Sequence, residues 1–229
     1  MYYPQVYRGK ILSSETLGFS AINKLVVNGR LQLTSLGLEG DEQAETRFHG
    51  GPDRALCHYP REHYLFWWRQ FPELTELFAS PLFGENISTE GLTEDNVYIG
   101  DIFQWGEALI QVTQPRSPCY KLNLVTNISD FAAMMQNNGR CGWLYRVISS
   151  GLVSAGEPIK LLSRNSDVSV KEALSIAFHN PFDEELYRRL MGAAGLSASW
   201  NLTMQKRILY GKIEDFNRRL FGNKNNAKE

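Results

Sequence analysis

The stretch SAINKLVVNGRLQLTSL, residues 20–36, carries the pattern that decides the fold class. Two runs rich in aliphatic and β-branched residues, Ser20–Val27 and Arg30–Leu36, lie on either side of the dipeptide Asn28–Gly29. Asn and Gly both tolerate positive φ, which a two-residue turn between antiparallel strands requires. The stretch therefore predicts a β-hairpin within a mainly β protein.

Short runs of the same kind recur along the chain as far as about residue 163, separated by glycine-containing turns. Many short strands at close spacing favour a barrel or a sandwich over a parallel α/β sheet. Two segments, 60–71 and 129–138, have the composition and end signals of inserted helices. We expect a β-barrel domain over residues 1–163. Its other expected strands are Val6–Leu12, Ala55–Tyr59, Val97–Ile99, Ile102–Trp105, Leu109–Thr113 and Pro158–Leu162.

A helical pattern replaces the strands after Ser163. Ser169, Asp183 and Ser197 each precede an amphipathic run, as N-cap residues do, and Glu172 completes a capping box with Ser169. We expect an all-α module of three helices over residues 164–222. The polar tail 223–229 is expected to be disordered.

The composition is that of an ordinary globular chain of 229 residues, 43% hydrophobic and 21% charged. A formal net charge of −1 makes no case for nucleic acid or an acidic membrane surface as a partner. No run approaches the roughly 18 apolar residues of a membrane span, and the start lacks the features of a secretory signal. Three cysteines far apart form neither a disulfide framework nor a close-spaced metal site. We expect a cytoplasmic monomer or homodimer with free cysteines.

Cys119 stands apart from the other two cysteines. It lies in the segment Pro115–Arg116–Ser117–Pro118–Cys119–Tyr120, where two prolines exclude a helix and the nearby cations Arg116 and Lys121 favour a thiolate. Such a thiolate is suited to be a ligand or a nucleophile, and a plain loop cysteine is the alternative. Cys57, in an apolar strand, and Cys141, beside Gly142, are expected to be inert packing residues.

Two further clusters contain candidate binding residues. In His49–Gly50–Gly51–Pro52–Asp53–Arg54 the paired glycines allow an anion-binding nest and Arg54 offers a fork for phosphate, although a glycine turn with a capping Asp is the alternative. The second cluster is Phe83–Gly84–Glu85–Asn86. His58 and His63 are expected to lie on an aromatic face and on a helix surface, and not to bind metal.

Taken in order, these motifs resemble the signatures of the MOSC domain, first named from the C-terminal part of molybdenum-cofactor sulfurases. The resemblance covers residues 10–162, and the helical module makes the chain similar to bacterial proteins that protect against 6-N-hydroxylaminopurine. The motifs that carry it are Gly40–Asp41, His49–Gly50–Gly51, Phe83–Gly84–Glu85–Asn86 with Gly91–Leu92, Gly100–Asp101, Arg116–Ser117–Pro118–Cys119 and, in the module, Leu196–Ser197 with Ser199–Trp200.

The resemblance implies a β-barrel that binds a molybdenum cofactor (Mo-pyranopterin) through the sulfur of Cys119. It further implies reduction of N-hydroxylated compounds, in which R–NHOH becomes R–NH2 and water. The residues available for the phosphate and pterin are Arg116, Ser117, Arg54, Gly50 and Gly51, with His49 and Asn86 as candidates for pterin hydrogen bonds.

Electrons are expected to come from a separate NADPH-dependent flavoprotein reductase. The chain has no G-x-G-x-x-G motif after a strand and no cysteine cluster, so we expect no nucleotide site and no intrinsic flavin, haem or iron–sulfur cluster. The helical module is expected to support folding, dimer contacts or docking of that reductase, and not to supply cofactor ligands.

Two alternatives stay open on the sequence alone. A sulfur carrier would use a persulfide on Cys119. A non-enzymatic binding module would grip nucleic acid with its mildly basic helical tail, although acidic residues are interleaved with the basic ones there.

Overall fold

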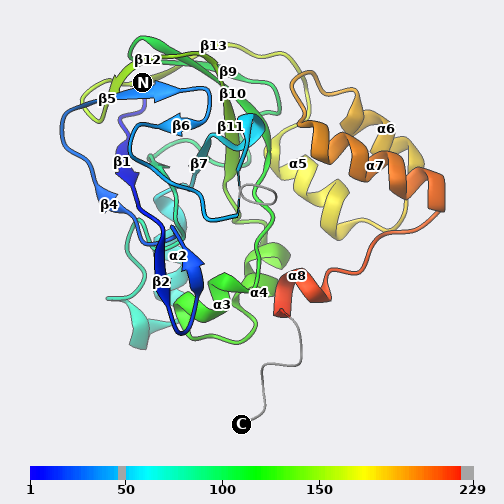
Figure 1. Cartoon of the computed structure of the whole chain (residues 1–229). Coiled ribbons are helices and arrows are strands. Elements are labelled where there is room, and N and C mark those ends of the chain that lie inside the picture. Colours follow the sequence, from blue (N-terminus) through cyan, green and yellow to red (C-terminus); the bar gives the residue numbers. More distant parts are fainter. Residues whose placement is uncertain (46–49, 223–229) are drawn as a thin grey trace.

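The computed structural model of the chain describes residues 1–45 and 50–222. Its largest part is an eight-stranded sheet that curls into a half-barrel, with the strand order β13–β9–β10–β11–β7–β8–β1–β4 (Figure 1). This confirms the expected mainly β, barrel-type class. The strands of this sheet are β1 (Gln5–Arg8), β4 (Leu25–Val26), β7 (Leu56–His58), β8 (Ile87–Ser88), β9 (Ile102–Trp105), β10 (Ala108–Pro115), β11 (Trp143–Ser149) and β13 (Ile159–Ser163).

Two smaller sheets complete the β-rich part. One has three strands in the order β12–β5–β6, and the other is a hairpin of β2 and β3. β12 follows β11 after a single residue, so the chain passes directly from the main sheet into the three-stranded sheet. The strands are β2 (Leu12–Ser14), β3 (Gly18–Ser20), β5 (Arg30–Thr34), β6 (Gly37–Leu38) and β12 (Gly151–Ser154).

The hairpin expected at Asn28–Gly29 is wrong. β4, before the turn, pairs with β1, whereas β5, after the turn, pairs with β12 and β6. Gly29 does take a positive φ, of 102°, but the turn carries the chain from one sheet to another. Long-range pairing prevails over local turn chemistry because β5 buries Leu33 completely between its partners, which an isolated two-stranded hairpin could not do.

The other strand predictions agree with the structure to differing degrees. Ile102–Trp105 coincides with β9, and the expected strands at 55–59, 109–113 and 158–162 are found within two residues. Val6–Leu12 and Ser20–Val27 are each interrupted. Val97–Ile99 forms no strand and makes only the isolated bridge between Tyr98 and Ser169, which joins the barrel to the start of the helical module.

Helices α2 (Glu62–Gln70) and α4 (Phe131–Asn138) confirm the two expected insertions. Their apolar sides meet in an aromatic core, where the rings of Trp67 and Phe131 lie with centroids 4.5 Å apart and both residues are fully buried. Helix α3 (Lys121–Thr126) was not expected. It begins two residues after Cys119 and ends at Asn127, which takes a left-handed conformation.

The C-terminal module begins at the expected caps. The Ser169 hydroxyl accepts from the Glu172 N–H at the start of α5 (Val170–Leu174), Asp183 caps α6 (Glu184–Met191) and Ser197 caps α7 (Ala198–Tyr210). α5 continues as a π-helix over Ser175–His179. A further short helix, α8 (Asn217–Phe221), was not expected, and Figure 1 shows it returning to the barrel beside α4.

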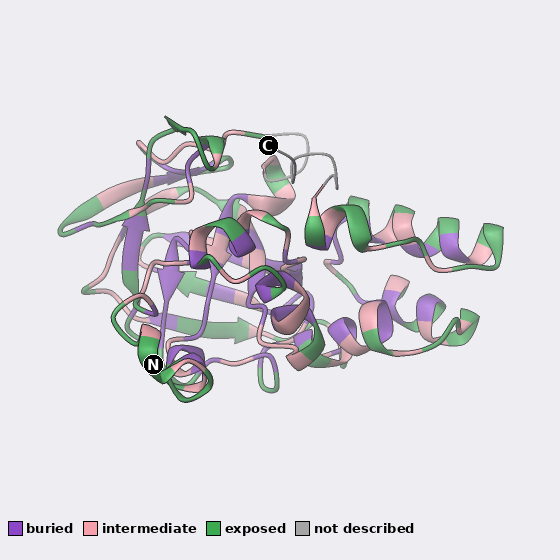
Figure 2. Cartoon of the chain, turned by 90° about the horizontal axis from the view of Figure 1, so that it is seen from below, coloured by how far each residue is buried: buried purple, intermediate pink, exposed green. Residues whose placement is uncertain are grey.

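Burial follows the two parts of the chain. Figure 2 shows buried residues along the strands of the main sheet, whereas the helices of the module alternate buried and exposed positions, as amphipathic helices do. Within residues 1–45 and 50–222 no helix has the length and apolarity needed to cross a membrane.

Candidate functional site

The Cys119 loop, residues 115–120, leaves β10, which lies between β9 and β11 in the main sheet. Pro115 is the last residue of β10 and pairs with Trp143 on β11, and the Arg116 N–H then donates to the Gly142 carbonyl at 3.0 Å. The Cys119 carbonyl accepts from the Leu122 N–H at the start of α3. Cys119 itself is a free, partly exposed cysteine. The loop is thus held at both ends, and Cys119 within it is partly exposed.

Arg116 carries an unusual donor. Its Nη1 is buried and has no hydrogen-bond partner in the part of the chain that the structure describes. Burial alone would lower the pKa of Arg116, but interactions with Cys57, Cys119 and Glu85 outweigh burial and raise it. A buried, charged guanidinium with an unused donor is costly unless an acceptor completes it. Arg116 therefore offers an unused donor that an anionic group could complete.

Cys57, which was expected to be an inert strand residue, lies in the surroundings of Arg116. It is partly exposed, and burial raises the pKa of its thiol, while the neighbouring Arg116 acts in the opposite direction. Cys141, in contrast, is fully buried, donates its S–H toward the Met135 carbonyl at 3.3 Å and has a raised pKa because of burial. The packing role expected for Cys141 agrees with its position, whereas Cys57 belongs to the surroundings of Arg116.

Asn86 is fixed by other parts of the barrel. Its amide oxygen accepts from the Cys57 N–H at 3.1 Å, and its amide nitrogen donates to the Tyr7 carbonyl and to Asp41. It is only 3% exposed. These bonds hold β7 in register behind Cys57, and the pterin contact expected for Asn86 stays a prediction.

The two histidines are both core residues. His58 is fully buried, and its ring nitrogens lie 3.1 Å from the Tyr145 hydroxyl and 2.9 Å from the Thr89 hydroxyl. His63 was expected on a helix surface, and this is wrong. Its Nε2 lies 2.7 Å from Glu94 in the interior, because α2 turns that face toward the barrel.

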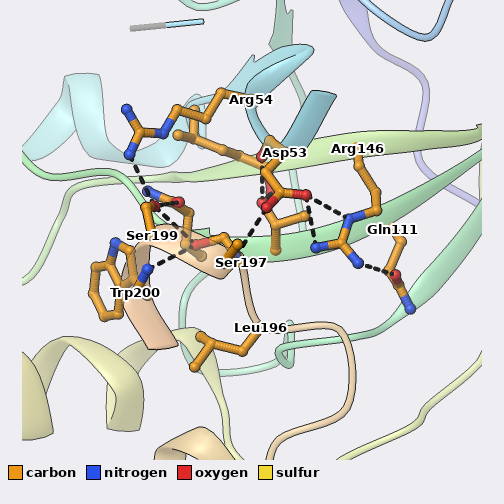
Figure 3. A network of polar contacts seen from close by, with 12 residues as sticks. Asp53, Arg54, Gln111, Arg146, Leu196, Ser197, Ser199 and Trp200 are labelled. Atoms are coloured by element: carbon orange, nitrogen blue, oxygen red, sulfur yellow. Dashed lines mark hydrogen bonds and ion pairs between the residues drawn. The ribbon is translucent and has the colours of Figure 1, made fainter. Parts of the chain in front are cut away.

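The glycine cluster is bound to the helical module. Gly51 takes a φ of 94° before the short 3-10 helix Pro52–Arg54. The Asp53 carboxylate accepts from the Ala198 N–H at 3.0 Å and pairs with Arg146 at 2.8 Å (Figure 3). Arg54 Nη2 donates to the Ser199 hydroxyl at 3.0 Å. His49 lies outside the described residues.

Ser199 brings the two predicted clusters together. Its hydroxyl accepts from Arg54 and lies 3.3 Å from the side-chain oxygen of Gln114, the residue before the Cys119 loop (Figure 3). The first turn of α7 therefore connects the Gly50–Arg54 segment with the end of β10. Ser199 thus links Arg54 to Gln114, directly before the Cys119 loop, and the sequence did not predict this link.

A pocket opens between the Cys119 loop and the module. Ser117 lines it from the barrel side, and every other lining residue comes from the C-terminal helices and the segment before α8. Arg207, which is 2% exposed, donates to both Glu214 oxygens at 2.7 and 2.8 Å and so fixes one wall. The lining residues are Ser117, Ala177, Phe178, Trp200, Thr203, Met204, Arg207, Glu214 and Arg219.

Three arginines of the module are paired with acidic residues. Arg188 pairs with Glu184, Arg189 with Glu172 and Asp167, and Arg207 with Glu214. A nucleic-acid interface needs cations that are available to phosphates. These pairs argue against the alternative in which the module grips nucleic acid.

The match to a family model and to a relative identifies the class of protein: the chain belongs to the MOSC-domain family. The family model for the MOSC domain matches residues 45–160, and a model described as "YiiM-like, 3-alpha helix domain" matches residues 168–209.

Known relatives agree in sequence and in structure. "Protein YiiM" of Escherichia coli (strain K12) is 66% identical over 97% of this chain and 100% of its own length. The crystal structure of YiiM from Escherichia coli superimposes with a TM-score of 0.86 at 61% identity, covering 96% of this chain and 98% of that one. A protein named "Reductase" from Gibberella moniliformis is 36% identical over 70% of this chain and 29% of its own length.

Proposed function

We propose that the chain is a molybdenum-cofactor-dependent reductase of N-hydroxylated compounds, including 6-N-hydroxylaminopurine. Membership of the MOSC family and the relative named a reductase support oxidoreductase chemistry. The observation that carries the proposal is the buried Nη1 of Arg116, which lacks a partner among the described residues three positions before a partly exposed cysteine.

A cofactor with a metal at one end and a phosphate at the other fits these residues. Molybdenum prefers soft ligands, and Cys119 Sγ would supply one. The phosphate needs charge-assisted donors, which Arg116 Nη1 and the Ser117 hydroxyl would supply. Arg54 is linked through Ser199 to Gln114, directly before the loop. Arg54, with the neighbouring Gly50 and Gly51, would bind the outer portion of the cofactor.

The reaction consumes two electrons and two protons, R–NHOH + 2e− + 2H+ → R–NH2 + H2O. When bound, the cofactor supplies the two-electron chemistry that cleaves the N–O bond. The residues of this chain hold the cofactor, keep Arg116 charged beside it and form the pocket next to Ser117 in which the substrate would lie. We propose a separate NADPH-dependent flavoprotein reductase as the electron donor.

Elemental analysis tests the proposal directly. The chain is purified from a host that makes the cofactor, and molybdenum per chain is measured for the wild type, Cys119→Ser and Cys141→Ala. We expect molybdenum in the wild type and in Cys141→Ala, and its loss in a folded Cys119→Ser protein. Equal molybdenum in the two cysteine variants would contradict the role of Cys119. Sulfane sulfur on Cys119 in a wild type without molybdenum would instead support the sulfur-carrier alternative.

Arg116→Met tests the anion site separately. Truncating the guanidinium to an apolar side chain of similar length removes the donors and the charge. We expect lower retention of the phosphate-bearing pterin, measured as its fluorescent oxidation product. Full retention would show that Arg116 binds something else.

A further inference from the structure

Helix α8 is bonded directly to the Cys119 loop. The Tyr120 N–H donates to the Arg219 carbonyl at 2.8 Å, and the Asn123 side chain donates to the Leu220 carbonyl at 2.8 Å. The Arg219 side chain also contacts the loop, where its Nη1 donates to the Pro118 carbonyl. The residues on both sides of Cys119 are thereby tied to one turn of the last helix.

The Arg219 guanidinium makes several specific contacts, although it lies near the end of the described residues. Its Nη2 donates to the buried Gln136 side chain at 2.5 Å, and its charge lies over the rings of Phe178 and Phe216, 5.1 and 5.2 Å from their centroids. Burial lowers its pKa, and interactions with Cys141 and Cys119 oppose that shift. Arg219 is partly buried, and its two hydrogen bonds and two ring contacts fix the guanidinium.

We propose that Arg219 is a positioning residue of the site, which holds the Cys119 loop from the module side while Arg116 anchors it to the barrel. The helical module is then part of the site and not only a support for folding or docking. This inference rests on the proposed function where it concerns the cofactor. Its geometric part concerns the loop alone and can be tested in protein without cofactor.

The first test measures amide hydrogen exchange in the cofactor-free chain. Arg219→Met keeps an apolar stem and removes the donors, Arg219→Lys keeps the charge and one donor, and Arg218→Met is the control at the exposed neighbouring position. We expect exchange of the loop around Tyr120 to become about tenfold faster in Arg219→Met, the factor that corresponds to losing one charge-assisted hydrogen bond. Arg219→Lys should restore part of the protection, and Arg218→Met should match the wild type.

Unchanged loop exchange in folded Arg219→Met would overturn the proposal. If that variant does not fold, the proposal is tested on the wild type, by native-state hydrogen exchange at increasing denaturant concentration. A loop held by α8 must open together with α8, so the Tyr120 and Leu220 amides should show the same opening free energy. Loop opening that is independent of α8 would overturn the proposal.

The second test uses chains loaded with cofactor and a low-potential dye as the electron donor. With activity expressed per bound molybdenum, Arg219→Met should lower kcat about tenfold because the Cys119 loop is disturbed. The KM for the substrate is measured separately, because Arg219 also lines the pocket. Arg218→Met should change neither value. An unchanged kcat per molybdenum would overturn the functional part. Absence of molybdenum from the wild type would contradict the proposed function and leave the exchange result valid.

Discussion

The Asp53 carboxylate accepts a hydrogen bond from the Ala198 N–H, 145 residues further along the chain. Ala198 is the first residue of α7, where backbone N–H groups lack partners within the helix. Asp53 therefore acts as a second cap on α7, supplied by the barrel, beside the local cap Ser197. The same carboxylate binds Arg146 on β11, so one side chain joins the module, the Gly50–Arg54 segment and the main sheet.

Removing this charge should loosen the module. We expect Asp53→Asn to lower the free energy of unfolding by about 1–2 kcal/mol, because a capping carboxylate and a partly buried ion pair are both weakened. Urea denaturation measures the loss. The control is Asp167→Asn, which removes the charge of a residue that pairs with Arg189 and is 78% exposed, and which should cost less than about 0.5 kcal/mol. Equal effects of the two variants would show that Asp53 is an ordinary surface acid.

Gly100 lies where the barrel touches the module. Its φ is 83°, and a Cβ built on it would lie 1.8 Å from the Ala194 carbonyl oxygen. Gly29 has a similar φ of 102° but open space around it. Gly29→Ala should therefore cost about 1 kcal/mol from backbone strain alone, and Gly100→Ala more than about 3 kcal/mol, because two backbone segments must also separate. Thermal or urea denaturation of the pair isolates the packing contribution, and similar losses would contradict it.

His58 should make the protein sensitive to acid. Burial lowers its pKa from 6.5 to about 3. Between these values the unfolded chain binds a proton that the folded chain does not, so stability falls as the pH drops through this window, by at most about 1.4 kcal/mol per pH unit. His58→Gln should be less stable than the wild type at pH 7, with the difference shrinking toward pH 4.

Glu85 has the opposite effect on the pH dependence of stability, and the comparison of His58→Gln with the wild type removes this effect. Burial raises the pKa of Glu85, so that group favours the folded state as the pH falls, but it is present in both proteins and cancels in the difference. A stability difference that stays constant or widens on acidification would contradict the assignment to His58.

The proposed enzyme depends on an external electron donor, and this distinguishes it from an enzyme that binds NADPH itself. Purified chain with NADPH alone should not reduce 6-N-hydroxylaminopurine, whereas an added flavoprotein reductase or a low-potential dye should start turnover. Formation of the amino product, followed by chromatography, is the readout. Steady oxidation of NADPH by this chain alone would reveal a nucleotide site that neither motif nor pocket indicated.

Features decided within a few residues could be predicted from the sequence. The caps Ser169, Asp183 and Ser197 all bind the N–H groups that their spacing indicated, because a cap needs only the next turn. Helix α8 was missed for the same reason, since Phe216 at its N-cap makes no side-chain bond. The short helix is instead held by its tertiary bonds to the Cys119 loop.

Features decided over long distances could not be predicted. The turn at Asn28–Gly29 has the local chemistry of a hairpin, yet β5 finds its partner in β12 at Leu33↔Gly151. In the candidate site, the Cys119 loop was evident because its residues are contiguous. The contacts of Arg54 with Ser199 and of Pro118 with Arg219 span 145 and 101 positions, and no periodicity records such pairs.

The separation of Asp53 from Ala198 also has a consequence for synthesis of the chain. At about 5–20 residues per second, the ribosome adds Ala198 about 7–30 s after Asp53, and Arg219 follows Cys119 by a similar order of time. Until Arg219 has been added, the Cys119 loop lacks its contacts with α8. Its final geometry is therefore acquired after the last helix is made, so a nascent or prematurely ended chain would present the thiol without the partner that positions it. If the chain binds the proposed cofactor, insertion would then be a step of maturation that follows translation.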